Sequence, residues 1–418
     1  MDELVREESL LATKKGPLYQ VFGSLYIRNY RLLWLGNFIS SIGLWMEQVA
    51  AGWLMLILTG SPFMVGLASF ARGIPLLLVS PASGVLADRL DRRRFLIANQ
   101  AILAAVALVL AMLIVTGSIE PWHLLAGSVV SGSAFAMLLP ARQALVPGLV
   151  GRAHLTNAIA LHSMGNSATR ILGPSLAGAL IGFVGIMACF FLQCVGYLAA
   201  LWLTVAMRTA PNARDAVRGT MWQNLRAGFA YIRADKSVLS LMILASVMCF
   251  FAMPYTAMLP VLARDVFKVD ATGLGILMSI MGAGSLAGSL ALAIWTALPR
   301  RGVLVLLSVL IFSLGTIALA RSDSFATACM AMGVIGVANA FNMSLGNTLI
   351  QELVPDALRG RVSSSYMMTF GLMPLGSLAV GMIAEVSGAP LAIGLGGAVS
   401  VVAVILVAIF VPELRELE

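Results

Sequence analysis

Three ionisable residues of this chain lie inside long apolar stretches: Glu47, Arg72 and Arg170. An ionisable side chain at the centre of a membrane helix costs about 2.5 to 3.5 kcal/mol on insertion scales, so its presence suggests a function. A carboxyl group in an apolar cavity can take up and release a proton, and a nearby arginine can set its proton affinity or bind an anionic ligand. The sequence therefore predicts a proton-coupling site at Glu47, Arg72 and Arg170.

The same three residues allow a second interpretation, in which Glu47 and an arginine form an ion pair that holds neighbouring helices together. Counted at about 1.5 Å per residue from the expected helix ends, all three lie at a similar depth. If Glu47 lies between two cations, it is ionised and its charge is balanced by theirs. If it faces an apolar cavity, its carboxyl group is suited to proton exchange. The residues alone leave both interpretations open.

Composition places these residues in a bilayer. Apolar residues make up 60% of the 418 positions and charged residues only 11%, with a mean hydropathy of +0.94, which leaves too few polar groups to cover a soluble surface. About 20 apolar residues cross the hydrocarbon core as a helix, and no stretch shows the alternation typical of lipid-spanning strands. The twelve predicted spans are residues 32–58, 63–86, 95–116, 122–141, 156–182, 184–207, 238–262, 272–296, 302–320, 325–350, 362–386 and 389–411.

The basic residues predict the orientation of the chain. With the amino terminus in the cytoplasm, 22 of the 27 Lys and Arg fall at cytoplasmic helix ends and loops, as expected for short loops. Residues 1–27 have no apolar core, so no cleavable signal is expected. We predict a multi-pass protein of the bacterial cytoplasmic (inner) membrane with both termini in the cytoplasm, and the net charge of +8 then reports topology rather than a nucleic-acid partner.

Two halves of the chain echo each other. Gln143–Pro147 recurs as Gln351–Pro355 at an offset of 208 residues, and a glycine pair, Gly66 with Gly73, recurs as Gly275 with Gly282 at an offset of 209. Such offsets predict two pseudo-symmetric six-helix bundles around a central cavity, in an all-α integral membrane protein. The predicted parts are a cytoplasmic segment (1–31), the first bundle (32–207), a cytoplasmic linker (208–237), the second bundle (238–411) and a cytoplasmic tail (412–418).

A charged loop between the second and third predicted spans has the order Gly84-Val85-Leu86-Ala87-Asp88-Arg89-Leu90-Asp91-Arg92-Arg93-Arg94. It resembles the signature loop of the major facilitator superfamily, except that Asp91 stands where glycine is usual. The resemblance implies a conformational latch, formed by Gly84, Asp88, Arg89 and Arg92, that closes the cytoplasmic side against helix 11. An alternative is that the arginines, above all Arg93 and Arg94, only determine topology.

The fifth predicted span contains Gly173-Pro174-Ser175-Leu176-Ala177-Gly178, which is similar to an element of superfamily members that export solutes. Thr59–Pro62, Pro140–Leu145 and Leu358–Val362 look like the subgroup of macrolide and enterobactin exporters. The resemblance implies efflux rather than uptake, although Gly173, Pro174 and Gly178 could also serve close helix packing. Two departures leave the coupling ion open: Leu298–Gly302 lacks the acidic residue of the first signature loop, and helix 4 lacks an arginine found in many drug/proton antiporters.

Six residues are candidates to line a substrate cavity, although polar residues of this kind also bridge helices by hydrogen bonds. They are Gln48, Asn166, Gln193, Phe251, Asn339 and Asn342.

Four cysteines and three histidines lack ligand spacing, so no metal site is expected. The chain has no Gly-x-x-x-x-Gly-Lys-Ser/Thr motif, which argues against ATP hydrolysis and against an enzyme.

We therefore predict a proton-coupled exporter of amphiphilic, drug- or macrolide-like small molecules that works by alternating access. It is expected to use the proton gradient, to need no cofactor and to act as a monomer. A siderophore or other metabolite exporter is the nearest alternative. A solute importer and a transport-dead membrane sensor are further alternatives, and a sensor would be expected to carry an added soluble domain.

Overall fold

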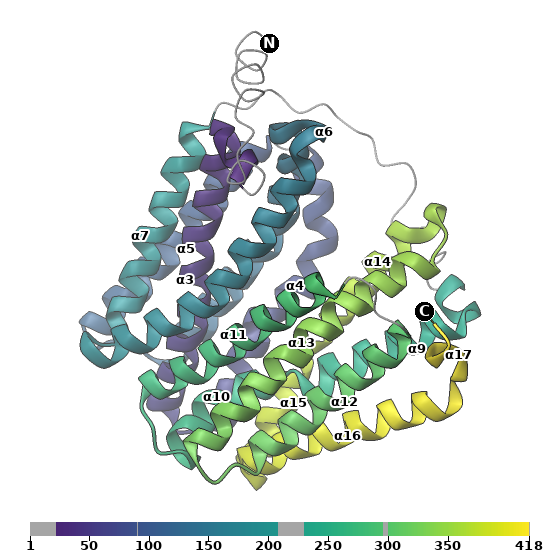
Figure 1. The fold of residues 1–418 in the computed structure, drawn as a ribbon. Coiled ribbons are helices and arrows are strands. Elements are labelled where there is room, and N and C mark those ends of the chain that lie inside the picture. The colour runs from purple at the N-terminus through teal and green to yellow at the C-terminus, as the bar shows by residue number, and fades with distance from the viewer. Residues whose placement is uncertain (1–21, 90, 208–229, 296–299, 418) are drawn as a thin grey trace.

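The computed structural model describes residues 22–89, 91–207, 230–295 and 300–417, and every regular element in these ranges is helical (Figure 1). The elements before residue 208 are called the N-terminal half here: η1 (Gly23–Tyr26), α3 (Arg28–Thr59), α4 (Pro62–Arg89), α5 (Arg92–Val115), α6 (Pro121–Phe183) and α7 (Ile186–Ala206). The later elements form the C-terminal half: α9 (Lys236–Val247), η2 (Met248–Ala252), α10 (Tyr255–Val261), η3 (Leu262–Val266), α11 (Ala271–Ile294), α12 (Arg301–Ala320), α13 (Phe325–Leu353), α14 (Asp356–Thr369), α15 (Leu372–Ser387), α16 (Ala389–Phe410) and α17 (Pro412–Arg415).

The all-α fold is confirmed for the described residues, and ten helical segments among them are long and apolar enough to cross a membrane. Their ends lie within a few residues of the predicted spans. The predicted spans 122–141 and 156–182 both lie in α6, a 63-residue element that contains a break at Gly151, where φ is 67° and ψ is 174°. Glycine accepts this backbone conformation because it has no β-carbon.

Asp91, the residue that departs from the family loop, caps the start of α5. Its carboxylate accepts hydrogen bonds from the backbone N–H groups of Arg93 at 2.9 Å and Arg94 at 3.1 Å. Aspartate is a favoured N-cap because it satisfies donors that the first turn of a helix leaves free. Arg93 makes a tertiary contact, since its guanidinium donates to the carbonyl oxygens of Thr204 at 3.2 Å and of Val205, at the end of α7.

Two of the predicted spans are interrupted rather than straight. The segment from Lys236 to Val266 contains π-helical turns at η2 and η3, close to Pro254 and Pro260. Proline lacks a backbone N–H and cannot make the regular bond, so wider turns are a common accommodation. The predicted span 362–386 is likewise divided into α14 and α15 at Phe370 and Gly371.

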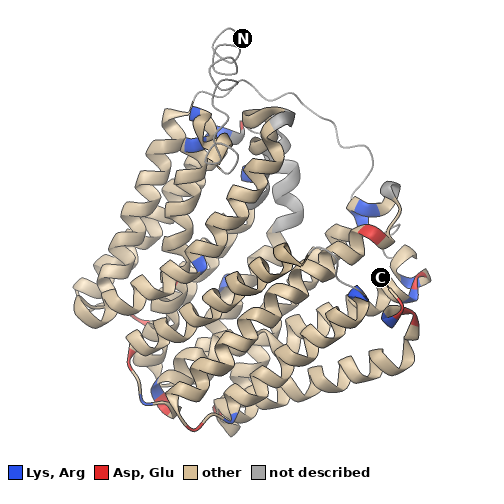
Figure 2. Cartoon of the chain, in the orientation of Figure 1, with Lys and Arg blue, Asp and Glu red and all other residues tan. Residues whose placement is uncertain are grey.

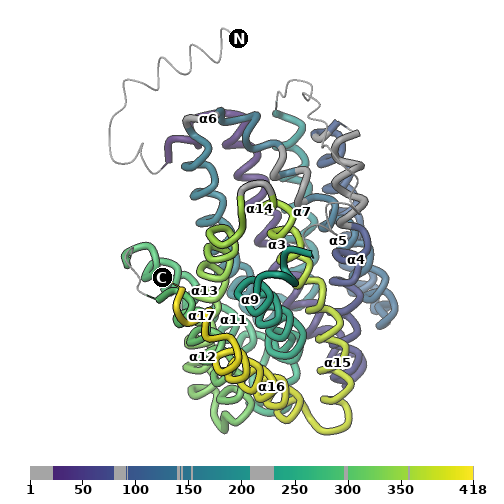
Figure 3. The backbone as a smooth tube through the Cα atoms, turned by 90° about the vertical axis from the view of Figure 1, so that its right-hand side faces the viewer, coloured from purple at the N-terminus to yellow at the C-terminus, as the bar shows by residue number. Residues whose placement is uncertain are grey.

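The two halves meet closely at one end of the molecule, where α3 ends at Thr59 and α4 begins at Pro62; we call it the distal end. There α4 lies against α15, and α6 lies against α11. The halves spread apart towards the opposite, terminal end, where α3 begins and the described chain finishes after α17 (Figure 1). Figure 3 shows the same arrangement from the side of the C-terminal half, with α12 and α16 towards the viewer.

Glycines make the contacts between the halves possible. A β-carbon added to Gly66 would lie 2.5 Å from the carbonyl oxygen of Ser377, and one added to Gly275 would lie 2.6 Å from that of Pro174. These two glycines occupy equivalent places in the sequence repeat. Both therefore allow a helix of one half to approach the backbone of the other half more closely than any larger residue would permit.

Charged residues gather mainly at the ends of the helices, and the long middle sections carry few of them (Figure 2). This distribution fits a helical membrane protein, in which the backbone is satisfied inside each helix and the side chains facing lipid are apolar. The few charges away from the helix ends therefore need partners or a function.

Candidate functional site

Glu47 is the centre of a buried polar cluster formed by three helices of the N-terminal half. The side chain lies on α3 and is 4% exposed. Its Oε1 atom is 3.4 Å from Nη1 of Arg72 on α4, and its Oε2 atom accepts a hydrogen bond of 2.5 Å from Nε2 of Gln193 on α7. Both carboxylate oxygens thus have a donor, as a buried carboxylate requires.

Arg72 also ties α4 to the backbone of α3. Its Nη2 atom donates to the carbonyl oxygen of Leu44 at 3.3 Å, one turn before Glu47. The Arg72 side chain keeps 22% of its surface exposed, in contrast to its partner. The pair can act as a structural tie, or as a switch if protonation of Glu47 opens it.

Arg170 does not join this cluster. Its guanidinium lies over the ring of Trp45, with the central carbon 5.4 Å from the ring centroid, a cation–π contact between α6 and α3. Its Nε atom is buried and has no hydrogen-bond partner among the described residues. The three predicted coupling residues therefore divide into an ion pair, Glu47 with Arg72, and a separate arginine that retains an unused donor.

The motif of the fifth predicted span, Gly173 to Gly178 in α6, makes two different contacts. A β-carbon on Gly173 would lie 2.4 Å from Cβ of Trp45, so this glycine lets α6 pack on α3 inside the N-terminal half. Gly178 faces the C-terminal half instead, where an added β-carbon would lie 3.0 Å from the carbonyl oxygen of Ala271. Pro174 lies on the same side, since its carbonyl oxygen faces Gly275. Close packing accounts for both glycines.

The six cavity candidates differ in exposure and in their partners. Gln193 is used by Glu47, and Asn166 is exposed and has its amide nitrogen 3.2 Å from Nε2 of His162. Phe251 is 39% exposed and packs edge-on against Phe250. Asn339 and Asn342 are buried on α13, and Oδ1 of Asn339 has no partner among the described residues; Gln48 is half-buried.

Sequence reasoning missed a polar chain that starts at Arg142, which was expected just beyond a span and lies within α6. Arg142 is 8% exposed and donates to Oδ1 of Asn37 and, at 2.9 Å, to the hydroxyl of Ser40, both on α3. The amide nitrogen of Asn37 lies 3.5 Å from Nδ1 of His162. A signal was present, because Asn37 and Ser40 are three residues apart and therefore share one face of a helix.

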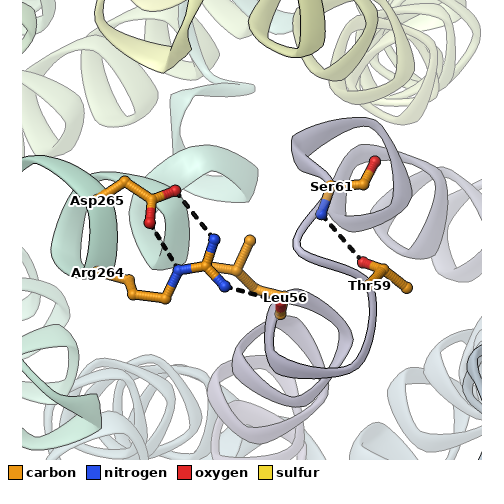
Figure 4. A network of polar contacts seen from close by, with 5 residues as sticks. All are labelled: Leu56, Thr59, Ser61, Arg264 and Asp265. Atoms are coloured by element: carbon orange, nitrogen blue, oxygen red, sulfur yellow. Dashed lines mark hydrogen bonds and ion pairs between the residues drawn. The ribbon is translucent and has the colours of Figure 1, made fainter.

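At the distal end, Arg264 joins the two halves (Figure 4). From η3 its Nη1 atom donates to the carbonyl oxygen of Leu56 at 2.9 Å, near the end of α3. Its other nitrogens are held by Asp265 at 2.6 and 3.1 Å, while Thr59 and Ser61 form the adjoining turn between α3 and α4. A cation at a helix C-terminus is favoured by the helix dipole.

Glu385, near the end of α15, makes the complementary contact. Its Oε2 atom accepts hydrogen bonds from the hydroxyl of Ser61 and the backbone N–H of Phe63 at the start of α4. The C-terminal half thus supplies two charged side chains to helix ends of the N-terminal half, and we call Arg264 and Glu385 together the distal clasp. The predicted latch residues, Gly84, Asp88, Arg89 and Arg92, are at positions whose side chains lie outside the described part of the chain.

Comparison with known proteins gives a consistent picture of the whole chain. A family model described as "Transmembrane secretion effector" matches residues 20–418. The staphyloferrin A transporter of Staphylococcus aureus (strain NCTC 8325 / PS 47) and macrolide efflux protein A of Streptococcus pyogenes are each 25% identical over 359 residues, covering 84% of this chain and 88% of the relative. The enterobactin exporter EntS of Escherichia coli O127:H6 is 25% identical over 338 residues, 80% of each chain.

Solved structures share the fold at lower sequence identity. A POT family transporter in complex with 5-aminolevulinic acid has a TM-score of 0.75 at 11% identity, covering 93% of this chain and 96% of that one. A bacterial homolog of the human lysosomal transporter Spinster, in an inward-facing and occupied conformation, has a TM-score of 0.72 at 17% identity and covers 93% and 98%. The nucleoside transporter NupG has a TM-score of 0.72 at 16% identity, with 91% and 99% covered.

Proposed function

The chain belongs to the transmembrane secretion effector family of the major facilitator superfamily, and we propose that it is a proton-coupled exporter of amphiphilic small molecules. It is a multi-pass membrane protein and a transporter by family. The buried Glu47–Arg72 pair is the main support for the proposal. Charged side chains inside a membrane bundle are costly, so their presence indicates a function. Protonation of Glu47 would release Arg72, and the pair would then have two states that a proton gradient can drive.

Alternating access gives the pair its role. In this proposal twelve spans form two six-helix bundles, residues 32–207 and 238–411, around a central cavity, with residues 1–31, 208–237 and 412–418 in the cytoplasm. The terminal end is then cytoplasmic, and the tight distal contacts at Gly66 and Gly275 close the opposite side of a bacterial inner membrane. Opening the distal side would separate these contacts, and the latch of Gly84, Asp88, Arg89 and Arg92 would hold the cytoplasmic side shut.

Arg170 is proposed to meet the substrate. Its Nε donor is buried without a partner among the described residues, and the neighbouring Trp45 ring offers an apolar face. An amphiphile with an aromatic or apolar body and an acceptor group would satisfy both. Gln48, Asn166, Phe251, Asn339 and Asn342 remain proposed contacts of the same path, whereas Gln193 is proposed to support Glu47.

A siderophore or other metabolite is the second candidate cargo. Among the relatives, the names of two refer to siderophores, staphyloferrin A and enterobactin, and the name of a third refers to macrolides. The unused arginine donor favours an acidic or catechol-bearing compound over a simple lipophilic cation. Neither cargo requires a cofactor, and both fit one chain acting as a monomer without enzymatic activity.

Substrate-induced proton movement in proteoliposomes tests the proposal. Lipophilic cations, macrolides and catecholate siderophores are added in turn to the wild type, to Glu47→Gln and to Glu413→Gln, whose exposed carboxylate pairs with Lys236 at the terminal end. We expect proton release with one compound class, its loss in Glu47→Gln and its retention in Glu413→Gln. If proton release persists in Glu47→Gln, the ion pair of Glu47 is structural. If no compound causes proton release, the proposal of proton-coupled export of these compound classes is wrong.

A further inference from the structure

The contact between Arg142 and Asn37 determines which side of the Asn37 amide faces His162. A guanidinium only donates, so Asn37 must present its amide oxygen to Arg142, as it does. The amide nitrogen of Asn37, which also only donates, then faces Nδ1 of His162 at 3.5 Å. In a hydrogen bond at this contact, Nδ1 is the acceptor and carries no proton.

The state of the imidazole follows from this direction. A neutral imidazole carries one proton, so with Nδ1 as the acceptor the proton is on Nε2. Asn166, whose amide lies 3.2 Å from Nε2, must then turn its oxygen towards the ring, because oxygen and nitrogen of an amide exchange places by a half-turn. His162 is held neutral, in the Nε2–H form, as long as Asn37 stays bound to Arg142.

We propose that His162 is a second proton-binding group of the N-terminal half, and that Arg142 is coupled to its protonation through Asn37. A proton on Nδ1 would face the donor nitrogen of Asn37, so the amide would have to turn. Its nitrogen would then face Arg142, and the buried guanidinium would lose one of its two acceptors on α3. Proton binding at His162 therefore weakens a tie between α3 and α6.

The charges around His162 support this coupling. Arg142 is the charged side chain that Asn37 links to His162. Glu47 is ten positions beyond Asn37 on α3, about 15 Å along the helix, and Arg170 is eight positions beyond His162 on α6, about 12 Å. Arg72 on α4 is held by Glu47, and Tyr197 on α7 is buried. The two proton-binding groups thus occupy different levels of the same half, with His162 nearer the terminal end.

The imidazole can be observed directly, since the chain has only three histidines, His123, His154 and His162. Full-length protein with ¹⁵N-labelled histidine is placed in lipid nanodiscs, and the imidazole nitrogen resonances are recorded against pH. His123→Gln and His154→Gln variants assign the signals. We expect His162 at neutral pH as the pure Nε2–H form. The Nδ1–H form, or the averaged mixture of a free imidazole, would overturn the proposal.

Two variants test the coupling. In Asn37→Asp a carboxylate accepts from both Arg142 and Nδ1–H, so the imidazolium signal should replace the neutral one at neutral pH; an unchanged neutral signal would overturn the proposal. Ser40→Ala removes the other acceptor of Arg142 without touching the ring, and it should leave the Nε2–H signal as it is. A change of form in Ser40→Ala equal to that in Asn37→Asp would show a general disturbance and overturn the specific role of Asn37.

The consequence for transport rests on the proposed proton-coupled export. His162→Gln keeps a neutral side chain, so export should persist while its dependence on cytoplasmic pH becomes flatter than that of the wild type. Unaltered pH dependence would remove His162 from the transport cycle. A failure of export by the wild type itself would count against the proposed function alone, because the nuclear magnetic resonance signals report the proton at His162 without any transport.

Discussion

Glu385 caps a helix that belongs to the other half of the chain, with its Oε2 atom 2.8 Å from the hydroxyl of Ser61 at the start of α4. The same oxygen accepts the backbone N–H of Phe63 at 3.0 Å. The start of a helix attracts negative charge, so this contact closes the distal end by electrostatics as well as by hydrogen bonds. Its strength should therefore depend on the charge of residue 385.

Glu385→Gln is expected to open the distal end. An amide can still accept hydrogen bonds but carries no charge to interact with the helix dipole, so the ratio of closed to open molecules should fall by about two- to fivefold. Spin labels at Ser118 and Asp323, in a background without the four native cysteines, report the distance between the halves at this end. Glu413→Gln removes a carboxylate at the terminal end and should leave the distribution unchanged; a shift of equal size there would contradict the role of Glu385.

Arg264→Lys is expected to act in the same direction. The guanidinium binds Asp265 and the Leu56 carbonyl oxygen at once, whereas an ammonium group cannot reproduce this forked geometry. The Leu56 contact should be lost first, and the same pair of spin labels should report the opening. Because Arg264 and Glu385 cap different helices, their effects should add in the double variant. A lysine variant that stays as closed as the wild type would show that charge alone is sufficient.

Gly66→Ala and Gly275→Ala should each prevent the distal end from closing. The added methyl groups would lie 2.5 and 2.6 Å from backbone oxygens of the other half, and such overpacking costs about 1 to 3 kcal/mol. Export in proteoliposomes should fall while the thermal unfolding midpoint stays close to that of the wild type. Gly333→Ala is the matched control, because its nearest neighbour would be 3.6 Å away. Normal export by both variants would exclude these contacts from the cycle.

The helices could be predicted from the sequence because apolar length is a local property. Most spans were located to within a few residues, and the glycine repeat at offset 209 identified two positions that the fold brings to the contacts between the halves. The break at Gly151 lies in the predicted connection between spans 122–141 and 156–182, although the rest of that connection is helical. The division of the span before Ser387 was not predicted, because it depends on backbone geometry and on neighbours far away in the chain.

Arg72→Leu should destabilise the protein more than the double change Glu47→Leu with Arg72→Leu. The single variant leaves a buried carboxylate with only Gln193 as a donor, and breaking one partner of a buried pair costs about 3 to 5 kcal/mol. Replacing both removes the uncompensated charge. Thermal unfolding in detergent compares the two variants. Equal midpoints would mean that the pair contributes no more than two separate side chains.

Asp91→Ala should loosen the first turn of α5. The two cap hydrogen bonds disappear, and loss of an N-cap typically costs about 1 kcal/mol, which is roughly a fivefold faster local opening. Hydrogen exchange measured by mass spectrometry on residues 92–99 checks this. Asp91→Asn retains an oxygen acceptor and should exchange almost as slowly as the wild type. Equal exchange by the alanine variant would show that the cap is dispensable.

The candidate site was predicted only in part. Glu47 and Arg72 meet as expected from their similar depth, but Arg170 turns to Trp45, and depth along a helix does not reveal which way a side chain points. Arg142 was assigned to a helix end because basic residues usually lie there. Its burial depends on Asn37 and Ser40 more than 100 positions earlier, a tertiary contact that hydropathy cannot show.

The glycine contacts have a consequence for the origin of the molecule. Gly66 on α4 meets α15 of the other half, and Gly275 on α11 meets α6, so each half offers one surface and receives the other in return. This reciprocal pairing is how two identical subunits associate across a twofold axis. A half-length ancestor could have bound its own copy through both surfaces at once. Gene fusion would then have joined two subunits that already recognised each other, and the halves expressed today as separate polypeptides should still assemble.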